Sequence, residues 1–170
     1  AELDHDLASR IYNLIEKGAE ALGVENGVIK GDLVITQDGD PMIIELAARL
    51  SGGWLATHQI PKATGVNLVD AVITSALNEE VTIEKLTARY NRAVAIRYWF
   101  PKEGIIKSIK GENQLKEAPG VFKYDFFRKP GDPQPKIRMH SDRFGYVMTE
   151  GDNRKEAIER VEHALSCISI

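Results

Sequence analysis

Residues 28–53 read VIKGDLVITQDGDPMIIELAARLSGG, and this stretch decides the fold of the first half of the chain. Val28–Thr36 is rich in β-branched residues, and the short apolar segment Met42–Leu46 follows it. Between them stands Asp38-Gly39, a dipeptide that is typical of tight hairpin turns because both residues tolerate a positive φ. The stretch therefore predicts two antiparallel strands joined by a short turn.

The turn also predicts which residues face each other across the hairpin. If Asp38-Gly39 forms a two-residue loop, the numbers of each facing pair add up to 77, so Asp32 lies opposite Glu45. Pro41 fits this register, because its missing N–H would point away from the partner strand. The two carboxylates would then lie on one face of the hairpin, with their Cβ atoms about 4.5–5.5 Å apart.

Two facing carboxylates repel each other, so either one of them keeps a proton or a cation lies between them. Oxygen ligands on a hairpin suit Mg²⁺, which binds one or two carboxylates together with phosphate oxygens and water. Lys30, Ala47 and Arg49 lie on the same predicted face, where an arginine is able to hold a phosphate through two hydrogen bonds. In the alternative interpretation Asp32 and Glu45 are solvated, and Lys30 and Arg49 are only their counter-ions.

Helices are predicted on both sides of this hairpin. Apolar residues recur every three or four positions from Leu3 to Leu22, and Gly23 is a suitable stop. No capping residue is evident at the start of this helix. A second amphipathic helix is predicted across Leu68–Leu77, and Asn67 is a suitable cap for it.

The last third of the chain alternates strands and turns and ends in a helix. The expected strands are Arg92–Phe100, Gly104–Ile109, Val121–Phe127 and Phe144–Thr149. In the first of them side chains are expected to alternate between the two faces, with Ala95, Arg97 and Trp99 on one face and Val94, Ile96, Tyr98 and Phe100 on the other. The segment 129–135, rich in Pro and Gly, is expected to be a loop without strand pairing, and Asn153 is expected to cap the final helix. This order of elements predicts an α+β fold with a mostly antiparallel sheet.

Composition excludes several classes of function. The chain has 170 residues, of which 43% are hydrophobic and 28% charged, and its net charge is −3. Without a basic block, binding to nucleic acid or to an anionic membrane is not expected. No apolar run approaches the roughly 20 residues of a membrane-spanning helix, and no signal peptide is evident. The single cysteine, Cys167, favours a reducing, cytoplasmic location.

The hairpin resembles the metal-binding end of the ATP-grasp fold. The residues that carry this resemblance are Gly31–Ile35 and Ile43–Gly53. The segments 142–147 and 151–158 resemble the carboxy-terminal subdomain of biotin carboxylase-like enzymes. The resemblance implies that residues 1–90 form the C-terminal lobe of an ATP-grasp domain. It implies that residues 91–170 form a small antiparallel β subdomain with a closing helix.

The same resemblance implies roles for single residues. Asp32 matches the first metal-binding acid of the family, Glu45 the second, and Arg49 the arginine that faces the phosphates and serves catalysis. Ala47 replaces the asparagine that is usual between the last two. The implied cofactors are ATP and Mg²⁺, with Mn²⁺ as an alternative metal.

The loop after the hairpin is implied to lie near the acceptor substrate. It consists of Ser51, Gly52 and Gly53, which are expected to be mobile, followed by Trp54 and His58. Trp54 would form the wall of a substrate pocket, and His58 would donate or accept a hydrogen bond there. Alternatively, Trp54 anchors the loop to the core and His58 is a structural residue.

The implied function is that of the C-terminal part of an ATP-dependent ligase. Such an enzyme phosphorylates a small carboxylate substrate and lets an amine attack the acyl phosphate. The implied partner is the missing N-terminal half, either in the same chain or as a separate subunit, and a homodimer is a further alternative. Two other functions stay open: a non-catalytic binding or assembly module, and a bicarbonate-activating fragment of the biotin carboxylase or carbamoyl-phosphate synthase type.

Overall fold

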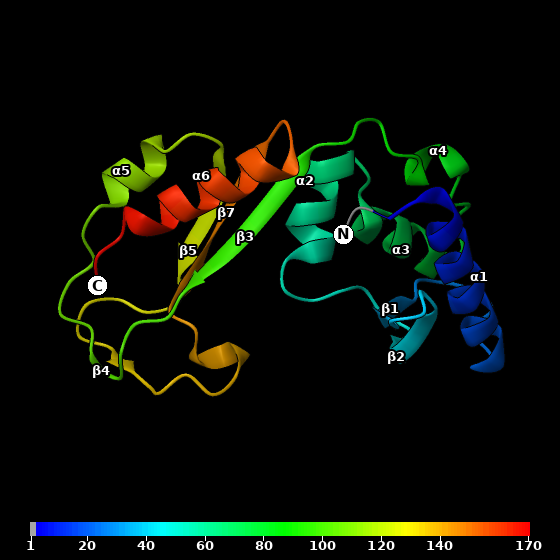
Figure 1. The fold of residues 1–170 in the computed structure, drawn as a ribbon, viewed down its shortest axis with the longest axis horizontal. Helices are drawn as coiled ribbons and strands as arrows, with labels where there is room; N and C mark the ends of the chain where they lie inside the picture. Colours follow the sequence, from blue (N-terminus) through cyan, green and yellow to red (C-terminus); the bar gives the residue numbers. More distant parts are fainter. Residues whose placement is uncertain (1–2) are drawn as a thin grey trace. The chain divides into compact units, whose positions relative to one another are not determined.

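A computed structural model describes residues 3–170 of the chain (Figure 1). It divides into two compact units. The first unit contains the described residues up to Pro61 together with Val66–Thr87, and the second contains Lys62–Gly65 and Ala88–Ile170. Both units combine helices with antiparallel strands, so the predicted α+β class is confirmed.

The first unit is built from a hairpin and several helices. In chain order these are α1 (His5–Ala21), β1 (Lys30–Ile35), β2 (Pro41–Ala47), the π-helix η1 (Leu55–Gln59), α3 (Leu68–Ala76) and α4 (Ile83–Leu86). Helix α2 (Ile60–Thr64) crosses the boundary between the units. Within the described part of the chain, every helix is too short or too polar to cross a membrane.

Helix α1 begins after Asp4, whose side chain accepts a hydrogen bond of 2.7 Å from the backbone N–H of Leu7. The expectation that no residue caps this helix was wrong, because the aspartate satisfies one of the free N–H groups of the first turn. At Gly18 the helix approaches β2 so closely that an added Cβ would collide with the Leu46 side chain. Helix α1 therefore covers one face of the hairpin.

The turn of the hairpin differs from the predicted one. The backbone N–H of Thr36 donates to the carbonyl of Asp40 at 2.9 Å, so three residues form the loop instead of two. Gly39 in this loop has a φ of 85°, a conformation that favours glycine. Ile35 consequently pairs with Pro41, one residue away from the predicted register.

A β-bulge corrects the register further along the hairpin. Leu33 pairs with Ile43 but Asp32 pairs with Glu45, so Ile44 is the extra residue on β2. Strict alternation from Ile43 would have turned Glu45 toward α1. The extra residue turns Glu45 to the outer face instead. The predicted pair of carboxylates is thus confirmed, although the predicted register near the turn was wrong.

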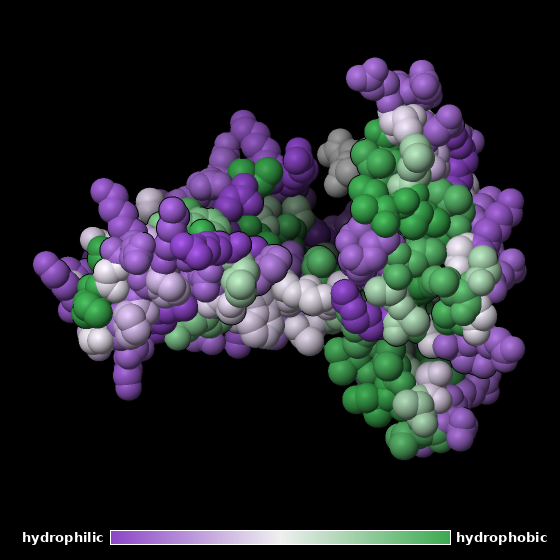
Figure 2. All heavy atoms as spheres, turned by 90° about the horizontal axis from the view of Figure 1, so that it is seen from below, coloured by the Kyte–Doolittle hydropathy of each residue, from purple (hydrophilic) through white to green (hydrophobic). Residues whose placement is uncertain are grey.

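The first unit buries few of its hydrophobic side chains. Within its described residues the buried ones are Ala56, Val66 and Ala71. The outer face of the hairpin exposes three large ones, Val34 at 46%, Met42 at 55% and Ile44 at 70%. Figure 2 shows hydrophobic side chains gathered on the surface of this unit. Patches of this kind commonly mark surfaces that bind other protein segments.

Helix α3 begins where the sequence predicted. The side chain of Asn67 accepts a hydrogen bond of 3.2 Å from the backbone N–H of Asp70. The helices η1, α2 and α4 were not predicted.

The second unit consists of strands and two longer helices. In chain order its elements are β3 (Ala93–Trp99), β4 (Gly104–Ile105), α5 (Glu112–Glu117), β5 (Val121–Phe126), β6 (Pro133–Gln134), the 3₁₀ helix η2 (His140–Asp142), β7 (Gly145–Gly151) and α6 (Arg154–Ser166). The antiparallel sheet has the order β3-β7-β5, and α6 packs along it (Figure 1).

The core of this unit lies between the sheet and the helices α5 and α6. Trp99, Leu115, Phe144, Val147 and Val161 are buried in it. The alternation predicted for 92–100 is confirmed, because Trp99 lies on the face that packs against α6, where its indole N–H donates to the carbonyl of Leu165 at 3.0 Å. The predicted cap of α6 is also confirmed: Asn153 accepts a hydrogen bond of 3.0 Å from the N–H of Glu156.

The expected loop 129–135 contains a short strand after all. Pro133 in β6 pairs with Ile105 in β4, and Gln134 pairs with Gly104. A two-residue edge strand tolerates a proline because few ladder hydrogen bonds are needed there. Gln134 is 1% exposed, and its side-chain amide donates to the carbonyls of Pro135 and Asp142. A buried side chain, which the local sequence does not reveal, thus holds this segment.

Candidate functional site

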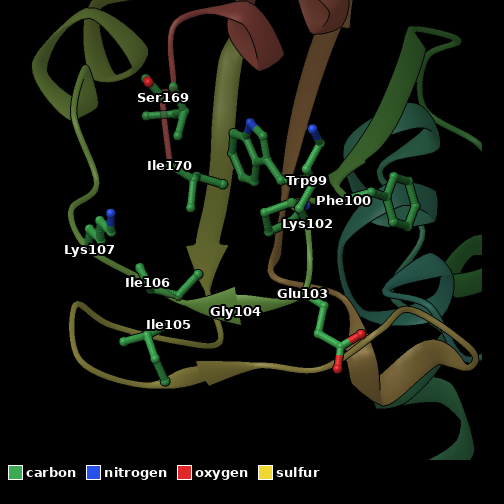
Figure 3. A pocket seen from close by; sticks show the side chains of 12 residues that line it. Trp99, Phe100, Lys102, Glu103, Gly104, Ile105, Ile106, Lys107, Ser169 and Ile170 are labelled. Atoms are coloured by element: carbon green, nitrogen blue, oxygen red, sulfur yellow. The ribbon is translucent and has the colours of Figure 1, made fainter.

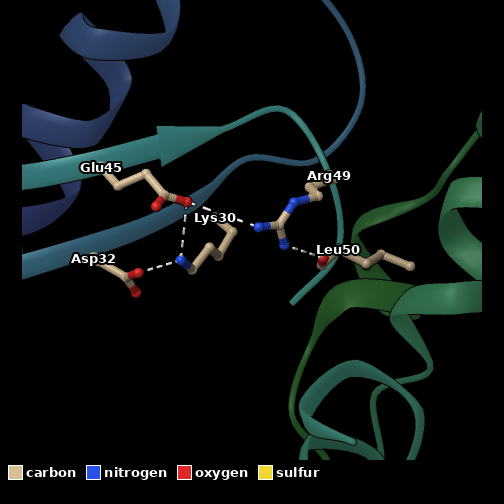
Figure 4. A network of polar contacts seen from close by, with 5 residues as sticks. All are labelled: Lys30, Asp32, Glu45, Arg49 and Leu50. Atoms are coloured by element: carbon tan, nitrogen blue, oxygen red, sulfur yellow. Dashed lines mark hydrogen bonds and ion pairs between the residues drawn. The ribbon is translucent and has the colours of Figure 1, made fainter. Parts of the chain in front are cut away.

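The candidate site lies on the outer face of the hairpin, where β1 and β2 place two carboxylates opposite each other. Asp32 and Glu45 form a cross-strand pair, and each side chain is 53% exposed. The bulge at Ile44 is the local feature that brings Glu45 to this face. In accordance with the prediction, Asp32 and Glu45 point to the same side (Figure 4).

Lys30 lies between these two carboxylates. Its ammonium group forms an ion pair with Asp32 and lies 3.4 Å from a carboxylate oxygen of Glu45. The Lys30 side chain is only 18% exposed, which is less than either acid. Its hydrogen bond to Asp32, supported by the one to Glu45, raises the pKa of Lys30 above its ordinary value. The ammonium group therefore stays charged at neutral pH and balances much of the repulsion between the acids.

Arg49 follows β2 and also turns toward the pair. Its guanidinium lies 3.7 Å from Glu45 and donates to the carbonyl of Leu50 at 3.2 Å (Figure 4). The side chain is 57% exposed, so most of its donors face solvent. The prediction that Arg49 lies on the same side as the carboxylates is confirmed. A planar guanidinium with free donors is suited to binding phosphate.

These residues suit a divalent cation that is shared with another ligand. Among residues 3–170, no three His, Cys, Asp or Glu side chains lie close enough together to hold a metal ion by themselves. Two carboxylates on one face are nevertheless the usual protein contribution to a Mg²⁺ site in which phosphates and water complete the coordination. The donor set therefore fits a metal whose coordination another ligand completes, rather than one that the described residues hold by themselves.

The loop after the hairpin has an unusual backbone. Trp54 has a φ of 65°, in the left-handed region that bulky side chains rarely adopt, and a π-helix follows it. Both features occur preferentially at functional sites. The ring of His58 meets the Trp54 indole edge-on at 5.6 Å, and its Nδ1 lies 2.8 Å from the hydroxyl of Thr57. The amide of Gln59 donates to the carbonyl of Gly53 at 3.1 Å and ties the loop to η1.

Sequence reasoning missed two parts of this site. It placed Lys30 on the correct face but did not include it among the site residues, although its position two residues before Asp32 was a sufficient signal. It gave Trp54 as a pocket wall or an anchor of the loop, but it did not predict the left-handed backbone at this residue. The left-handed backbone at Trp54 has no signature in the local sequence, because such a conformation normally requires Gly or Asn.

A pocket lies in the second unit. It has a volume of about 600 Å³ and is lined by the end of β3, by β4 and by the last residues of the chain. Trp99, Ile106 and Ile170 turn toward it, whereas the carboxylate of Glu103 points away (Figure 3). None of the predicted site residues lines this pocket. The hairpin face thus remains the candidate site, because Asp32, Glu45 and Arg49 lie together there.

Comparison with a family model supports the resemblance of the C-terminal segment. Residues 97–170 match the family described as L-amino acid ligase C-terminal domain 2. A comparison with curated proteins gives no match.

Comparison with solved structures covers both units. An L-amino acid ligase from Bacillus licheniformis matches with a TM-score of 0.83 and 21% identity, over 100% of this chain and 42% of that chain. A phosphoribosylglycinamide synthetase from Anaerococcus prevotii matches with a TM-score of 0.86 and 20% identity, over 100% of this chain and 43% of that chain. An N5-carboxyaminoimidazole ribonucleotide synthetase from Thermotoga maritima matches with a TM-score of 0.71 and 15% identity, over 99% of this chain and 44% of that chain.

The chain thus spans less than half the length of each of these proteins. At these levels of identity the likeness concerns the fold. The predicted resemblance is confirmed at that level: the chain has the α+β fold of the C-terminal portion of ATP-grasp ligases.

Proposed function

We propose that this chain is the phosphate-binding C-terminal part of an ATP-dependent ligase that activates a carboxylate as an acyl phosphate. The observation that carries the proposal is the arrangement of Asp32, Glu45 and Arg49 on one exposed face of the hairpin. The similar structures, a ligase and two synthetases, agree with bond formation between two substrates.

Each of these residues has a defined task in the proposed reaction. Asp32 and Glu45 would hold Mg²⁺, and Arg49 would bind an oxygen of the phosphoryl group during its transfer and of the acyl phosphate afterwards. When bound, Mg²⁺ neutralises charge on the nucleotide phosphates. The contribution of the chain is positioning and electrostatic stabilisation, which are the main requirements of phosphoryl transfer.

The acceptor substrate is proposed to lie near the loop after the hairpin. Trp54 offers a flat apolar wall whose orientation is held by a strained backbone and by the His58 ring. Such a wall suits a small carboxylate or amine with an apolar side chain. L-amino acid ligase activity is a candidate because of the family match over 97–170, and bicarbonate activation of the carboxylase type is the second candidate because pyruvate carboxylase from Rhizobium etli has the same fold over 98% of this chain.

The proposed partner is an N-terminal half that supplies the rest of the nucleotide site. Two observations support it: the chain corresponds to 42–44% of the similar proteins, and the hairpin exposes Val34, Met42 and Ile44 next to the carboxylates. A further protein segment would cover these side chains and form the second wall of the nucleotide site. This partner belongs either to the same polypeptide or to a separate subunit.

The test compares nucleotide binding by the purified 170-residue chain and by variants of its acids. We expect Mg²⁺-dependent binding of ATP at about millimolar Kd, or roughly −4 kcal/mol, as for an isolated half-site. Asp32→Asn and Glu45→Gln should abolish the dependence on Mg²⁺. Asp38→Asn is the matched control, because it removes a charge from the same hairpin while asparagine suits the turn equally well.

The competing function makes the opposite prediction. If the hairpin belonged to a non-catalytic assembly module with solvated acids, then Asp32→Asn, Glu45→Gln and Asp38→Asn would all bind ATP like the unmodified chain. That result would contradict the proposed function.

A further inference from the structure

The carboxylate pair already holds a cation of its own. Lys30 contacts Asp32 and Glu45 with the same ammonium group, and it lies where a divalent cation would bind both acids (Figure 4). Ala47 faces Lys30 across the hairpin, so a small side chain stands beside the lysine. Lys30 and Asp32 are two positions apart on an extended strand, about 6–7 Å, which is the reach of a lysine side chain along its own strand.

We infer that Lys30 is an internal counter-ion that competes with a divalent cation for Asp32 and Glu45, so that the pair binds metal well only together with a phosphate. This inference rests on the proposed function. Lys30 is then a positioning residue. Its ammonium group holds the two acids together in the absence of a metal, and it moves away from them when the metal and the nucleotide bind.

The competition follows from the oxygen atoms involved. Lys30 contacts Asp32 Oδ2 and Glu45 Oε1, and a metal held by the two acids would draw on the same two carboxylates. An ammonium group left about 4 Å from a dication would repel it, even with the screening of water. A nucleotide phosphate removes this conflict, because it offers the displaced lysine a new anionic partner.

Arg49 does not take the same position. It approaches Glu45 alone, at 3.7 Å, and one of its amino groups is engaged with the carbonyl of Leu50. Removing the charge of Lys30 should therefore free the pair for metal, whereas Arg49 stays available for phosphate.

The first experiment measures binding of Mn²⁺ alone to the 170-residue chain, by the loss of the electron paramagnetic resonance signal of free Mn²⁺. Lys30→Met keeps most of the side chain and removes the charge, and we expect it to bind Mn²⁺ about tenfold more tightly than the unmodified chain. Lys30→Arg keeps the positive charge, and this variant should bind Mn²⁺ as weakly as the unmodified chain does. Lys85→Met is the matched control, because it removes a lysine paired with Asp70, at 3.6 Å, away from the hairpin.

A fourth variant separates this inference from the proposed function. Asp32→Asn combined with Lys30→Met should lose the gain in Mn²⁺ affinity. If the double variant binds Mn²⁺ like Lys30→Met, Asp32 is not a metal ligand and the proposed function is wrong. If Asp32→Asn abolishes Mn²⁺ binding but Lys30→Met binds Mn²⁺ no more tightly than the unmodified chain, only the role proposed for Lys30 is wrong.

A second readout follows the lysine itself. In a chain labelled with ¹³C at the lysine ε-carbons, the signal missing from the Lys30→Met spectrum identifies Lys30. Adding MgCl₂ together with a non-hydrolysable ATP analogue should shift this signal, while the Lys85 signal stays in place. A Lys30 signal that does not move while the analogue binds would overturn the inference. Circular dichroism of each variant confirms that it is folded.

Discussion

Glu150 lies near the end of β7 and accepts hydrogen bonds from two cations of the second unit. Lys62 contacts it at 2.9 Å and Arg92 at 3.0 Å. The hydrogen bond from Lys62 is the largest cause that lowers the pKa of Glu150 below its ordinary value of 4.5. A carboxyl group with a lowered pKa stabilises the folded state above its unfolded pKa, and this contribution is lost as pH falls through the folded pKa.

Glu150→Gln should therefore destabilise the chain at neutral pH but not in acid. At pH 7 we expect the melting temperature to fall by about 2–4 °C, the shift that corresponds to about 1 kcal/mol in a chain of this size. The difference from the unmodified chain should shrink as pH falls below about 4.5. Glu159→Gln, which removes an exposed carboxylate 3.8 Å from Lys155, is the control and should change the melting temperature little. A pH-independent difference would contradict the assignment.

Arg49 presents most of its guanidinium to solvent beside Glu45, although charged groups of the opposite sign are close by. If it binds phosphate, Arg49→Met should weaken ATP binding by about tenfold, which corresponds to the loss of one charge-assisted hydrogen bond. Calorimetric titration with ATP and Mg²⁺ measures this change. Arg154→Met, an exposed arginine of α6, should leave the affinity unchanged. Equal affinities of both variants would restrict Arg49 to a counter-ion of Glu45.

At the scale of elements, the second unit depends on how closely β7 approaches α6. Gly151 ends β7, and a Cβ built on it would lie 2.6 Å from the backbone nitrogen of Ala157. The neighbouring hydroxyl of Thr149 donates to the carbonyl of Ala157 at 2.8 Å, so the strand and the helix are tied at this point. Backbone atoms on both sides leave a methyl group no space.

Gly151→Ala should destabilise the second unit by about 1–3 kcal/mol, the usual cost of overpacking. Urea denaturation followed by tryptophan fluorescence measures it, because Trp99 is buried in this unit. Gly52→Ala is the matched control, since nothing lies within 4 Å of its added Cβ. Equal stabilities of the two variants would show that α6 can move away from β7 at little cost.

Backbone irregularities in the hairpin and in the loop after it position the side chains of the candidate site. A π-helix follows the strained Trp54, and a bulge at Ile44 turns Glu45 outward. Both are local irregularities with a cost in free energy, and Ile44 and Trp54 both lie within ten residues of Glu45. Irregular backbone concentrated in this way is typical of a place where function, rather than stability, determines the structure.

For the whole molecule, the distribution of buried side chains is uneven. The second unit has a core with fully buried residues such as Leu115 and Phe144, whereas no described residue of α1, β1 or β2 is buried. Hydrophobic burial is the main source of stability, so the first unit is expected to be the less stable of the two. An additional protein segment on Val34, Met42 and Ile44 would supply the missing burial.

We predict that the 170-residue chain alone does not turn over ATP with any carboxylate and amine. Two carboxylates and an arginine do not enclose a nucleotide, and lost orientation of the reactants is worth about 7–11 kcal/mol of barrier. An ADP-release assay with the chain alone, and with an N-terminal half added separately, measures this. Turnover only after mixing would support the proposed partner. Robust turnover by the chain alone would contradict it.

Replacing Met42 and Ile44 by serine tests whether the outer face of the hairpin is the docking surface for the N-terminal half. These residues are exposed here and are not proposed to touch the metal or the phosphate. The double variant should keep the Mg²⁺-dependent ATP binding of the chain but lose activation by the N-terminal half. If activation persisted, the apolar face of the hairpin would not be the docking surface.

The sequence by itself determined the elements that depend on short-range rules. The alternation in residues 92–100 and the capping asparagines Asn67 and Asn153 each express a local preference of the backbone, and each element formed where expected. The Asp-Gly pair also lies in the turn, as expected. The pairing of Asp32 with Glu45 was predictable as well. That agreement depended on two deviations that cancel, a turn longer by one residue and a bulge of one residue.

The tertiary structure decided the features that depend on contacts between residues far apart in the sequence. Packing of α1 against Leu46 fixes which face of the hairpin is covered, and therefore which residue must bulge for Glu45 to face outward. A buried Gln134 side chain holds β6 in a segment whose composition predicts only a loop. The ammonium of Lys30 lies between two acids because the hairpin brings Glu45, 15 residues away in sequence, next to Lys30 and Asp32. Such contacts join distant parts of the chain, and their energies appear only once the backbone has folded.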